Sequence, residues 1–411
     1  MHTQLNSYDL VLKNGWVIDP SQSLNGRFDV AICDGKIAAI AEQLPPYETK
    51  QEIAASQYLI CPGFIDLHVH VYEWATTFGV AADDVGINAG VTTIVDQGSS
   101  SPFTFAGFQS EVIAKSKTDV RSFLLVNHAA NQTIGSILSG LESPQKVKIE
   151  TLIKLAQANP QIVRGFKVHA DSGSISRWGM GVLALARQIG DQTNLPLYVH
   201  TGELFPVVEA NRPNPEKLVE NALTYMKAGD ILGHCYSCQP DGLMGIRTQI
   251  PQWLLAAIEQ GILLDLGHGL KFSFAVARRM LAQGVFPDTI SSDAHGSFKN
   301  LHDDSTLTYS LCGAISKLVA LGLDLEKAIA AVTLNPARVL KAETELGTLK
   351  VGSIADISIL QLVEGEWCFF DALEEKLVAQ QKLIPVGVVR SGEFIQPSGR
   401  FLRDLVARAS A

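Results

Sequence analysis

The strongest constraint on the fold is a regular alternation of short apolar strands with segments of helical periodicity between residues 61 and 345. The strand candidates are 63–70, 92–97, 121–128, 162–169, 196–201, 230–235, 262–268 and 289–293. Their separation of roughly 25 to 40 residues is typical of βα units in a parallel sheet. Eight such units predict a closed (β/α)8 TIM barrel, an architecture of about 250 residues. A doubly wound open sheet is the main rival, but no glycine-rich nucleotide fingerprint follows the first strand to support it.

The residues on either side of this repeat have a different pattern, with short apolar runs and tight turns. Near the amino end, the run Phe28–Ile32 leads through Asp34-Gly35 into a second apolar run, which is a good hairpin signal. After about residue 345 the β pattern returns. We therefore predict a barrel domain over 61–345 and a small β-sandwich accessory domain built from 1–60 and 346–411 together.

Composition narrows the range of partners. The 411 residues are 46% hydrophobic and 18% charged, which is typical of a well-buried α/β chain. The net charge of −9 disfavours nucleic acid and anionic membranes, and no apolar run reaches the roughly 20 residues of a membrane helix. The first residues show no secretion signal, so the six cysteines predict reduced thiols in the cytoplasm. A small molecule is the expected partner, and the sequence leaves open whether the chain forms a homo-oligomer.

Ionisable side chains occur where the predicted strands end. The first strand ends in His68 and His70, whose side chains share one face because they stand two residues apart. Four further groups stand at the ends of later strands: Lys167, His200, His234 and Asp293. Active sites of such barrels lie at the carboxyl ends of the strands. A single histidine or aspartate there is more often a packing residue or a helix cap, but six such groups on five strands predict a metal site.

The donor set favours a borderline divalent ion such as zinc. Lys167 lies in the apolar string Gly165-Phe166-Lys167-Val168, where an unpaired ammonium would be costly. A lysine that is desolvated beside cations has a lowered pKa, so its amine is neutral. A neutral amine can react with carbon dioxide to form a carbamate, whose two oxygens can bridge two metal ions. The sequence leaves open whether Lys167 carries this modification.

Several longer motifs surround these groups. They are Val17-Ile18-Asp19-Pro20, Asp34-Gly35-Lys36-Ile37, Pro62-Gly63-Phe64-Ile65-Asp66-Leu67-His68-Val69-His70, Gly165-Phe166-Lys167, Ser292-Asp293, Thr333-Leu334-Asn335-Pro336-Ala337 and the run from Gly347 to Asp356. With the strand-end histidines, this set resembles the amidohydrolase superfamily, in its dihydroorotase-like and deacetylase-like branch. The resemblance spans nearly all 411 residues. It implies two divalent metal ions on a (β/α)8 barrel.

The resemblance also implies which residues hold the two ions. His68, His70 and Asp293 would hold the more buried ion, and His200 and His234 would hold the outer one. Lys167, as a carbamate, would bridge the ions together with a hydroxide that attacks the scissile carbonyl. Asp293 would be the catalytic residue, because it would accept the hydroxide proton and return it to the leaving group.

The activity implied is metal-dependent hydrolysis of an amide bond, with some ester cleavage, in a small N-acyl or acetylated substrate. One alternative is a cyclic-amide hydrolase of the dihydroorotase, hydantoinase or allantoinase type. Dihydroorotases usually place an arginine two residues after the second histidine, where this chain has Tyr72, and this disfavours dihydroorotase activity. An aminohydrolase of the cytosine or adenosine deaminase type is disfavoured by Lys167, since those enzymes usually use one metal ion and no bridging lysine. A non-enzymatic scaffold is disfavoured because no ligand position is missing.

Three residues are candidates for contacts with the substrate: Arg177, His268 and Tyr72. Arg177 follows the fourth predicted strand and is the first candidate for binding a substrate carboxylate. The weaker or more open candidates are Arg212, Lys271, His169, His128, Trp74 and Trp178. Cys235 and Cys238 form a C-x-x-C, but no second pair accompanies them, so we expect no further metal or redox site there.

Overall fold

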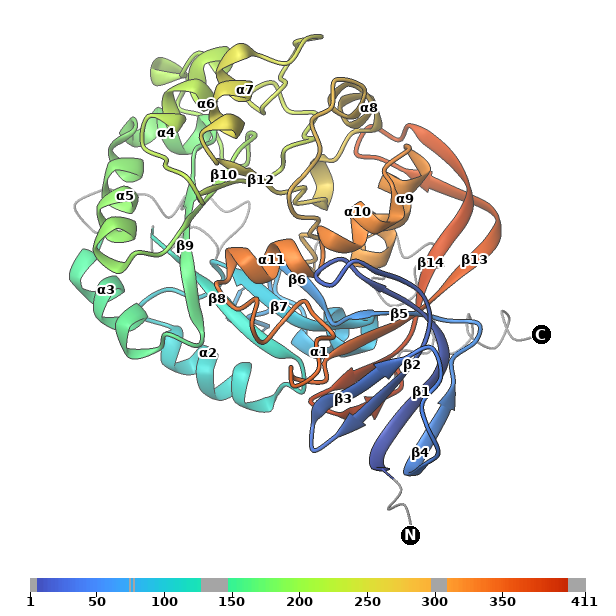
Figure 1. Ribbon diagram of the computed structural model, residues 1–411. Helices are drawn as coiled ribbons and strands as arrows, with labels where there is room; N and C mark the ends of the chain where they lie inside the picture. Colours follow the sequence, from blue (N-terminus) through green and yellow to red (C-terminus); the bar gives the residue numbers. More distant parts are fainter. Residues whose placement is uncertain (1–5, 74, 77, 127–146, 297–308, 398–411) are drawn as a thin grey trace.

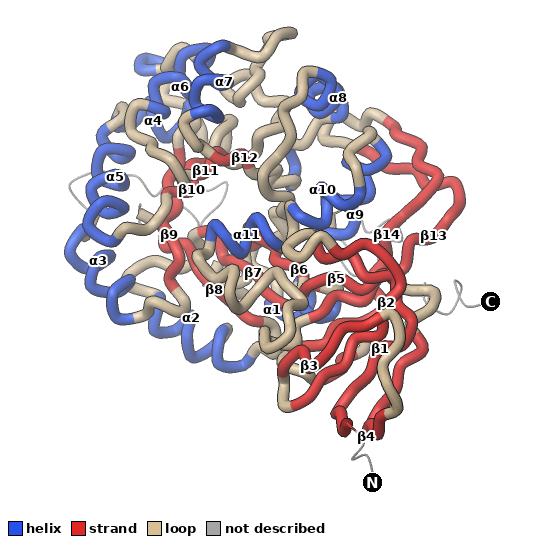
Figure 2. The backbone as a smooth tube through the Cα atoms, in the orientation of Figure 1, coloured by secondary structure: helices blue, strands red, loops and turns tan. Residues whose placement is uncertain are grey.

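The computed structural model describes residues 6–73, 75–76, 78–126, 147–296 and 309–397. Within these residues the strands form two sheets, one of seven strands and one of eight. The amino-terminal and carboxyl-terminal parts of the chain meet in the eight-stranded sheet, and the central part forms the seven-stranded sheet with helices around it (Figures 1 and 2). No helix in the described part combines the length and apolar composition that crossing a bilayer requires.

The seven-stranded sheet is parallel throughout, and its strands follow one another in chain order. They are β6 (Phe64–Val69), β7 (Val91–Gln97), β8 (Asp119–Leu125), β9 (Val163–His169), β10 (Leu197–His200), β11 (Ile231–Leu232) and β12 (Leu263–Leu264). Each coincides with a strand candidate of the sequence. The eighth candidate, 289–293, forms isolated parallel bridges instead, from Thr289 to Asp265 and from Ala294 to Val69.

Helices surround this sheet on its outer side (Figure 1). The longer ones are α2 (Phe105–Glu111), α3 (Ile149–Ala158), α4 (Ser172–Trp178), α5 (Gly181–Thr193), α6 (Pro215–Leu223), α7 (Gln252–Glu259), α8 (Phe274–Ala282), α9 (Leu311–Ala320), α10 (Leu325–Ala330) and α11 (Leu334–Val339). A four-residue helix, α1, spans Ala82–Val85, and short 3₁₀ turns cover Ile87–Ala89, Ile113–Lys115, Glu209–Asn211 and Gly269–Lys271. Several helices begin at a side-chain cap, such as Asp171 of α4, which accepts from two backbone N–H groups.

The strands of the parallel sheet are buried on both faces, as their near-continuous apolar sequences predict. Side chains on the inner face pack into one cluster with residues of α11 and the turn after it. Ile65, Phe123 and Ile231 contribute from the strands, and Val339 and Leu340 contribute from α11 and its end. This short helix therefore covers the amino-terminal ends of the strands.

The termini build the second sheet, in the order β15-β14-β13-β5-β1-β2-β3, with β4 paired to β1. The strands are β1 (Asn6–Asp19), β2 (Leu24–Cys33), β3 (Lys36–Ala41), β4 (Tyr47–Ala54), β5 (Leu59–Pro62), β13 (Ile357–Phe370), β14 (Lys376–Arg390) and β15 (Glu393–Ile395). The predicted hairpin joins β2 to β3, and both turn residues, Asp34 and Gly35, have positive φ as a type I′ turn requires. Hydrogen bonds join all eight strands into one sheet, so a division into two stacked layers stays a prediction.

The hairpin of β13 and β14 is much longer than the sequence indicates, and its far end reaches the helices of the central part. The N–H of Leu383 donates to the Ser316 hydroxyl on α9 at 3.0 Å. Near the tip, the Asp371 carboxylate caps the start of α8 by accepting from Phe274 N–H at 2.9 Å. These contacts attach the terminal sheet to the helical layer.

The inner cluster makes a stability prediction. Phe123 is fully buried between the strands, and its ring leaves so little room that a Cβ on Gly165 would lie 2.1 Å from it. Phe123→Ala should lower the free energy of unfolding by about 3–5 kcal/mol, because it removes the buried ring and leaves a cavity. Urea-induced unfolding of the metal-free protein measures this loss. Phe103→Ala is the matched control, since Phe103 is 68% exposed, and a similar loss in both variants would contradict the packing role of Phe123.

Candidate metal centre

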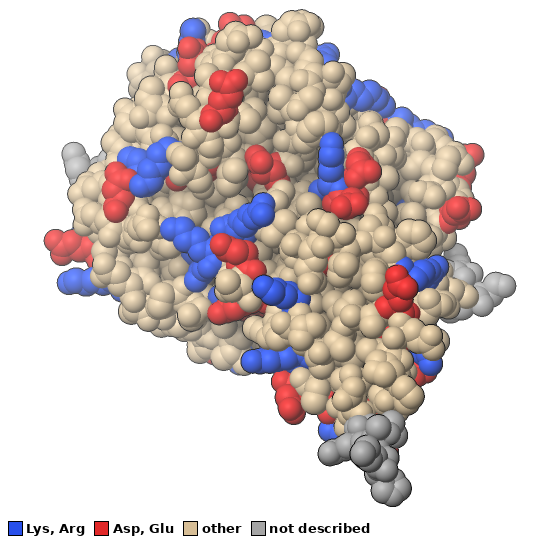
Figure 3. Space-filling model, in the orientation of Figure 1, with Lys and Arg blue, Asp and Glu red and all other residues tan. Residues whose placement is uncertain are grey.

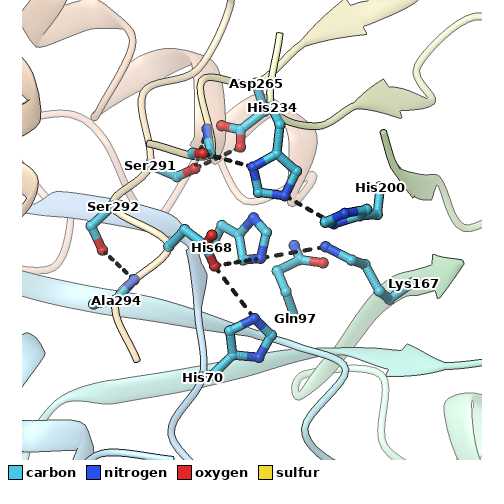
Figure 4. Close-up of polar contacts among 12 residues, drawn as sticks. His68, His70, Gln97, Lys167, His200, His234, Asp265, Ser291, Ser292 and Ala294 are labelled. Atoms are coloured by element: carbon cyan, nitrogen blue, oxygen red, sulfur yellow. Dashed lines mark hydrogen bonds and ion pairs between the residues drawn. The ribbon is translucent and has the colours of Figure 1, made fainter. Parts of the chain in front are cut away.

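The six ionisable groups that end the predicted strands lie together in the structure. His68 and His70 come from the end of β6, Lys167 from β9 and His200 from the end of β10. Figure 4 shows the four imidazoles and the lysine amine converging from these elements. All six side chains are buried, although the chain separates the first from the last by more than half its length. The carboxyl ends of parallel strands meet at one edge, which is why these groups gather.

One part of the cluster consists of His68, His70 and Asp293. The carboxylate Oδ1 of Asp293 lies 3.2 Å from Nε2 of His68 and 3.4 Å from Nε2 of His70. Donor atoms of the three residues lie within 4.8 Å of one another, so they can hold one metal ion. Asp293 has a positive φ of 52°, an uncommon backbone conformation for a residue other than glycine. Gly269 faces its other oxygen, and an added Cβ there would lie only 2.2 Å from Oδ2.

The hydrogen bonds around His68 show which of its ring nitrogens carries the proton. This assignment tests whether the three residues can bind a cation. The Tyr198 hydroxyl donates its single proton to Asp265 at 2.6 Å, so it accepts from Nδ1 of His68 at 2.8 Å. The proton of His68 is therefore on Nδ1, and its Nε2 lone pair faces Asp293. A lone pair and a carboxylate oxygen 3.2 Å apart repel each other, and a shared cation removes that repulsion. The arrangement fits a metal ion, with Tyr198 and Asp265 orienting the imidazole.

A second pair of imidazoles lies beside the first group. Nε2 of His234 and Nδ1 of His200 are 3.0 Å apart, and the rings of His68 and His234 have centroids 5.3 Å apart. Nδ1 of His234 donates to the Gly267 carbonyl at 2.7 Å, because a carbonyl only accepts. Its Nε2 is therefore free of a proton and directed into the cluster. This pair offers ligand atoms for a second metal ion.

Burial sets the protonation of these groups. Desolvation holds the pKa of His68 and His200 well below the usual value and lowers the pKa of His234 to about 3. Neutral imidazole is the form that binds metal. Desolvation also lowers the pKa of Lys167 to about 7. Its Nζ lies 3.4 Å from Nε2 of His68 and 4.0 Å from the centroid of the Tyr198 ring. A substantial fraction of this amine is thus neutral near neutral pH.

The three residues predicted to contact the substrate lie in different surroundings. The Tyr72 hydroxyl donates to the Thr104 carbonyl at 3.1 Å, and its ring packs against Phe108 of α2. Arg177 lies half-buried in the last turn of α4. His268 is buried, with Nε2 3.0 Å from Nζ of Lys317. The glycines on either side of His268 lie against His234 and Asp293, which places it next to the cluster.

Three further residues lie at the site: Lys271 and His169, which the sequence indicated only weakly, and His295, which was not a candidate. Nζ of Lys271 lies 3.1 Å from Nε2 of His200 and donates to the Gly202 carbonyl at 2.7 Å. His169 is buried beside His200, and its Nδ1 has no hydrogen-bond partner in the described part of the chain. His295 is buried near His70, and its position two residues after Asp293 was an available signal. His128 and Trp74 lie outside the described residues.

Comparisons with known proteins identify similar sequences and structures. The sequence profile described as the Amidohydrolase family matches residues 271–395. A deacetylase from Agrobacterium fabrum is 30% identical over 338 residues, which are 81% of this chain and 78% of the relative. Among solved structures, an adenine deaminase has a TM-score of 0.81 at 26% identity and covers 95% of this chain and 100% of its own. A dihydroorotase also has a TM-score of 0.81, at 28% identity, covering 94% and 99%.

The hydrogen bond from His68 to Tyr198 gives a test of the metal centre that does not depend on turnover. Tyr198→Phe removes the hydroxyl that fixes the His68 proton, and we expect metal affinity to fall by about 10- to 100-fold. Competition with a chromogenic chelator measures the affinity. Tyr236→Phe is the matched control, because Tyr236 is also fully buried but its hydroxyl donates to the Val285 carbonyl. Equal metal affinity in both variants would show that Tyr198 does not support a ligand.

Proposed function

This chain belongs to the amidohydrolase family, and from that premise we propose that it hydrolyses an amide bond in a small N-acyl or acetylated substrate. It is a hydrolase that acts on C–N bonds. The observation that carries the proposal is the buried group of His68, His70 and Asp293, with the His200 and His234 pair beside it. The likeness to a deacetylase over most of the chain favours an acetylated substrate, with some ester cleavage expected.

We propose that these residues hold two divalent ions, zinc being the ion that the donors suit best. His68, His70 and Asp293 would hold one ion, and His200 and His234 would hold the other. Lys167, as a carbamate derived from carbon dioxide, would bridge them; the neutral fraction of its buried amine supports this reaction. When bound, the ions would polarise the scissile carbonyl and lower the pKa of a water molecule.

The proton transfers would fall to Asp293. One oxygen of this carboxylate lies near the imidazoles of His68 and His70, and a side chain at position 269 would crowd the other. Asp293 would take a proton from the attacking water and return it to the leaving nitrogen. We propose Arg177 as the group that binds a substrate carboxylate and His268 as a further substrate contact. Tyr72 would present only its ring, since its hydroxyl is held by Thr104.

We also propose that the bridges made by 289–294 complete an eight-stranded (β/α)8 barrel. The N–H of Asp293 donates to the His68 carbonyl at 2.8 Å, and the N–H of Leu266 donates to the Thr289 carbonyl at 2.9 Å, so this segment contacts both edges of the seven-stranded sheet. The barrel domain would span 61–345, with 1–60 and 346–411 forming the accessory domain. The six cysteines are unpaired, which supports a reducing compartment such as the cytoplasm.

A cyclic-amide hydrolase is the second candidate, favoured by the likeness to a dihydroorotase at 28% identity. The likeness to an adenine deaminase is of similar extent. A buried lysine at the centre of the cluster disfavours an aminohydrolase of the cytosine or adenosine deaminase type, since those enzymes usually use one metal ion and no bridging lysine. The three chemistries act on different substrates, so a panel of substrates distinguishes them.

A substrate panel tests the proposed function. The zinc-loaded protein should hydrolyse N-acetyl amino acids with a higher kcat/KM than dihydroorotate, hydantoin or adenine. Asp293→Asn should lower kcat by about 10²- to 10⁴-fold, because an amide cannot carry the proton. Faster turnover of a cyclic amide or of adenine would replace the deacetylase proposal. A rate of Asp293→Asn within tenfold of the parent, about 1.4 kcal/mol of barrier, would contradict the role of Asp293.

The bridging role of Lys167 has its own test. Lys167→Ala should lose most bound metal and most activity, and added propionate with zinc should restore part of both by supplying a carboxylate in the vacated space. Atomic absorption measures the metal content. Lys382→Ala is the matched control, because Lys382 is a fully buried lysine that lies over the Trp367 ring in the other sheet. Normal metal content and turnover in Lys167→Ala would rule out the bridge.

A further inference from the structure

A cavity of about 310 Å³ lies at the end of the strands opposite the candidate metal centre. Its lining includes Leu195 and Pro196, just before β10, and Asp230, just before β11. By contrast, His200 ends β10 and His234 follows β11. Four residues of a β-strand span about 13 Å, so the cavity and the metal centre are separate sites on the same strands. The lining also includes residues of α11, the helix that covers this end of the strands.

The rim of this cavity is positively charged. Three of the lining residues are Lys227, Arg338 and Lys341, all exposed. Figure 3 shows several Lys and Arg side chains on this face, with Asp and Glu side chains among them. Lys227 pairs with Asp191 at 2.7 Å, and Nζ of Lys341 donates to the Asn194 carbonyl at 2.9 Å. The Arg338 guanidinium makes no hydrogen bond or ion pair with any residue that the structure describes. Its donors are available to a ligand.

Neither of the two carboxylates in the lining forms an ion pair with Arg338. Asp230 is buried and accepts from Nη1 of Arg187 at 2.6 Å and from the N–H of Leu197 at 2.8 Å. Asp288 accepts from the N–H of Leu264 at 2.8 Å. Both carboxylates therefore fix the starts of strands.

The walls of the cavity are largely apolar. Leu195, Pro196, Leu263 and Val339 contribute to them. Asn335, from the motif Thr333–Ala337, also lines the cavity, and its Nδ2 donates to the Asp288 carbonyl at 2.8 Å. Small-molecule sites of about 300–1,000 Å³ are usually apolar with a few placed polar groups. An inorganic anion would leave these apolar walls without a partner. An organic anion would contact both the apolar walls and the positively charged rim.

We propose that this cavity binds a small organic carboxylate. The planar guanidinium of Arg338 matches a carboxylate with two parallel hydrogen bonds, and Lys341 adds positive charge beside it. The apolar body of the ligand lies against Leu195, Leu263 and Val339. The site is independent of the proposed function, because it involves none of the clustered histidines and holds for any reaction at the other end of the strands.

Calorimetric titration of the zinc-loaded, full-length protein with benzoate tests this site, with benzamide as the neutral ligand of the same shape. Benzoate should bind saturably and at least tenfold more tightly than benzamide. Arg338→Gln should weaken benzoate binding at least tenfold, and Arg338→Glu should abolish it at this site. Thermal melting checks that each variant is folded. Lys376→Gln is the matched control, because Lys376 is an exposed lysine on the other sheet, and it should bind benzoate within twofold of the parent.

Benzoate bound at the metal centre would give a different pattern. Asp293→Asn changes that centre and leaves the cavity intact, so the component of binding that depends on Arg338 should persist in this variant. The proposal is overturned if the parent shows no saturable benzoate binding, or if Arg338→Gln binds benzoate as the parent does. Loss of all benzoate binding in Asp293→Asn alone would also overturn it. None of these results bears on the amide substrate.

Discussion

Desolvation of ionisable side chains at one end of a parallel sheet is the constraint on which the rest of the molecule depends. Burying an isolated charge there would cost several kcal/mol. Each ionisable group is therefore neutral or lies beside a partner. The amine of Lys167 has a lowered pKa, and Asp265 is surrounded by three hydroxyl donors, from Tyr198, Thr289 and Ser291. The apolar strands supply the water-excluding surroundings of these groups. The chemistry of the site therefore follows from its burial.

Much of the fold could be predicted from the sequence because parallel strands buried on both faces have continuous apolar runs. Seven strand candidates coincide with β6–β12. The lengths were less predictable: β11 and β12 have only two paired residues each, since pairing depends on neighbours that are distant in the chain. The long hairpin of β13 and β14 was missed over much of its length, because Gly365 and the charges at 364 and 366 interrupt the apolar period. Its support comes from α8 and α9, and no local pattern encodes that contact.

The site shows the same difference between what a local sequence pattern encodes and what depends on contacts between distant parts of the chain. His68 and His70 had to project together because they stand two residues apart on a strand, and the common direction of parallel strands brought the other four groups beside them. Tyr198 and Asp265 were overlooked because each lies within an apolar string and reads as a packing residue. Lys271 belongs to a loop after β12, whose path is set by tertiary contacts. The substrate contacts depend most on loops, so Arg177, His268 and Tyr72 remain predictions.

Two lines of hydrogen bonds meet at Asp265 in the interior. His68 donates to Tyr198 and Tyr198 donates to one carboxylate oxygen, while Thr289 donates to the other oxygen. The carboxylate only accepts, so its contact with Tyr198 fixes the proton of that hydroxyl and, through it, the proton of His68. Thr289 also lines the cavity at the far end of the strands. One buried carboxylate thus joins the imidazole at one end of the strands to a residue that lines the cavity at the other end.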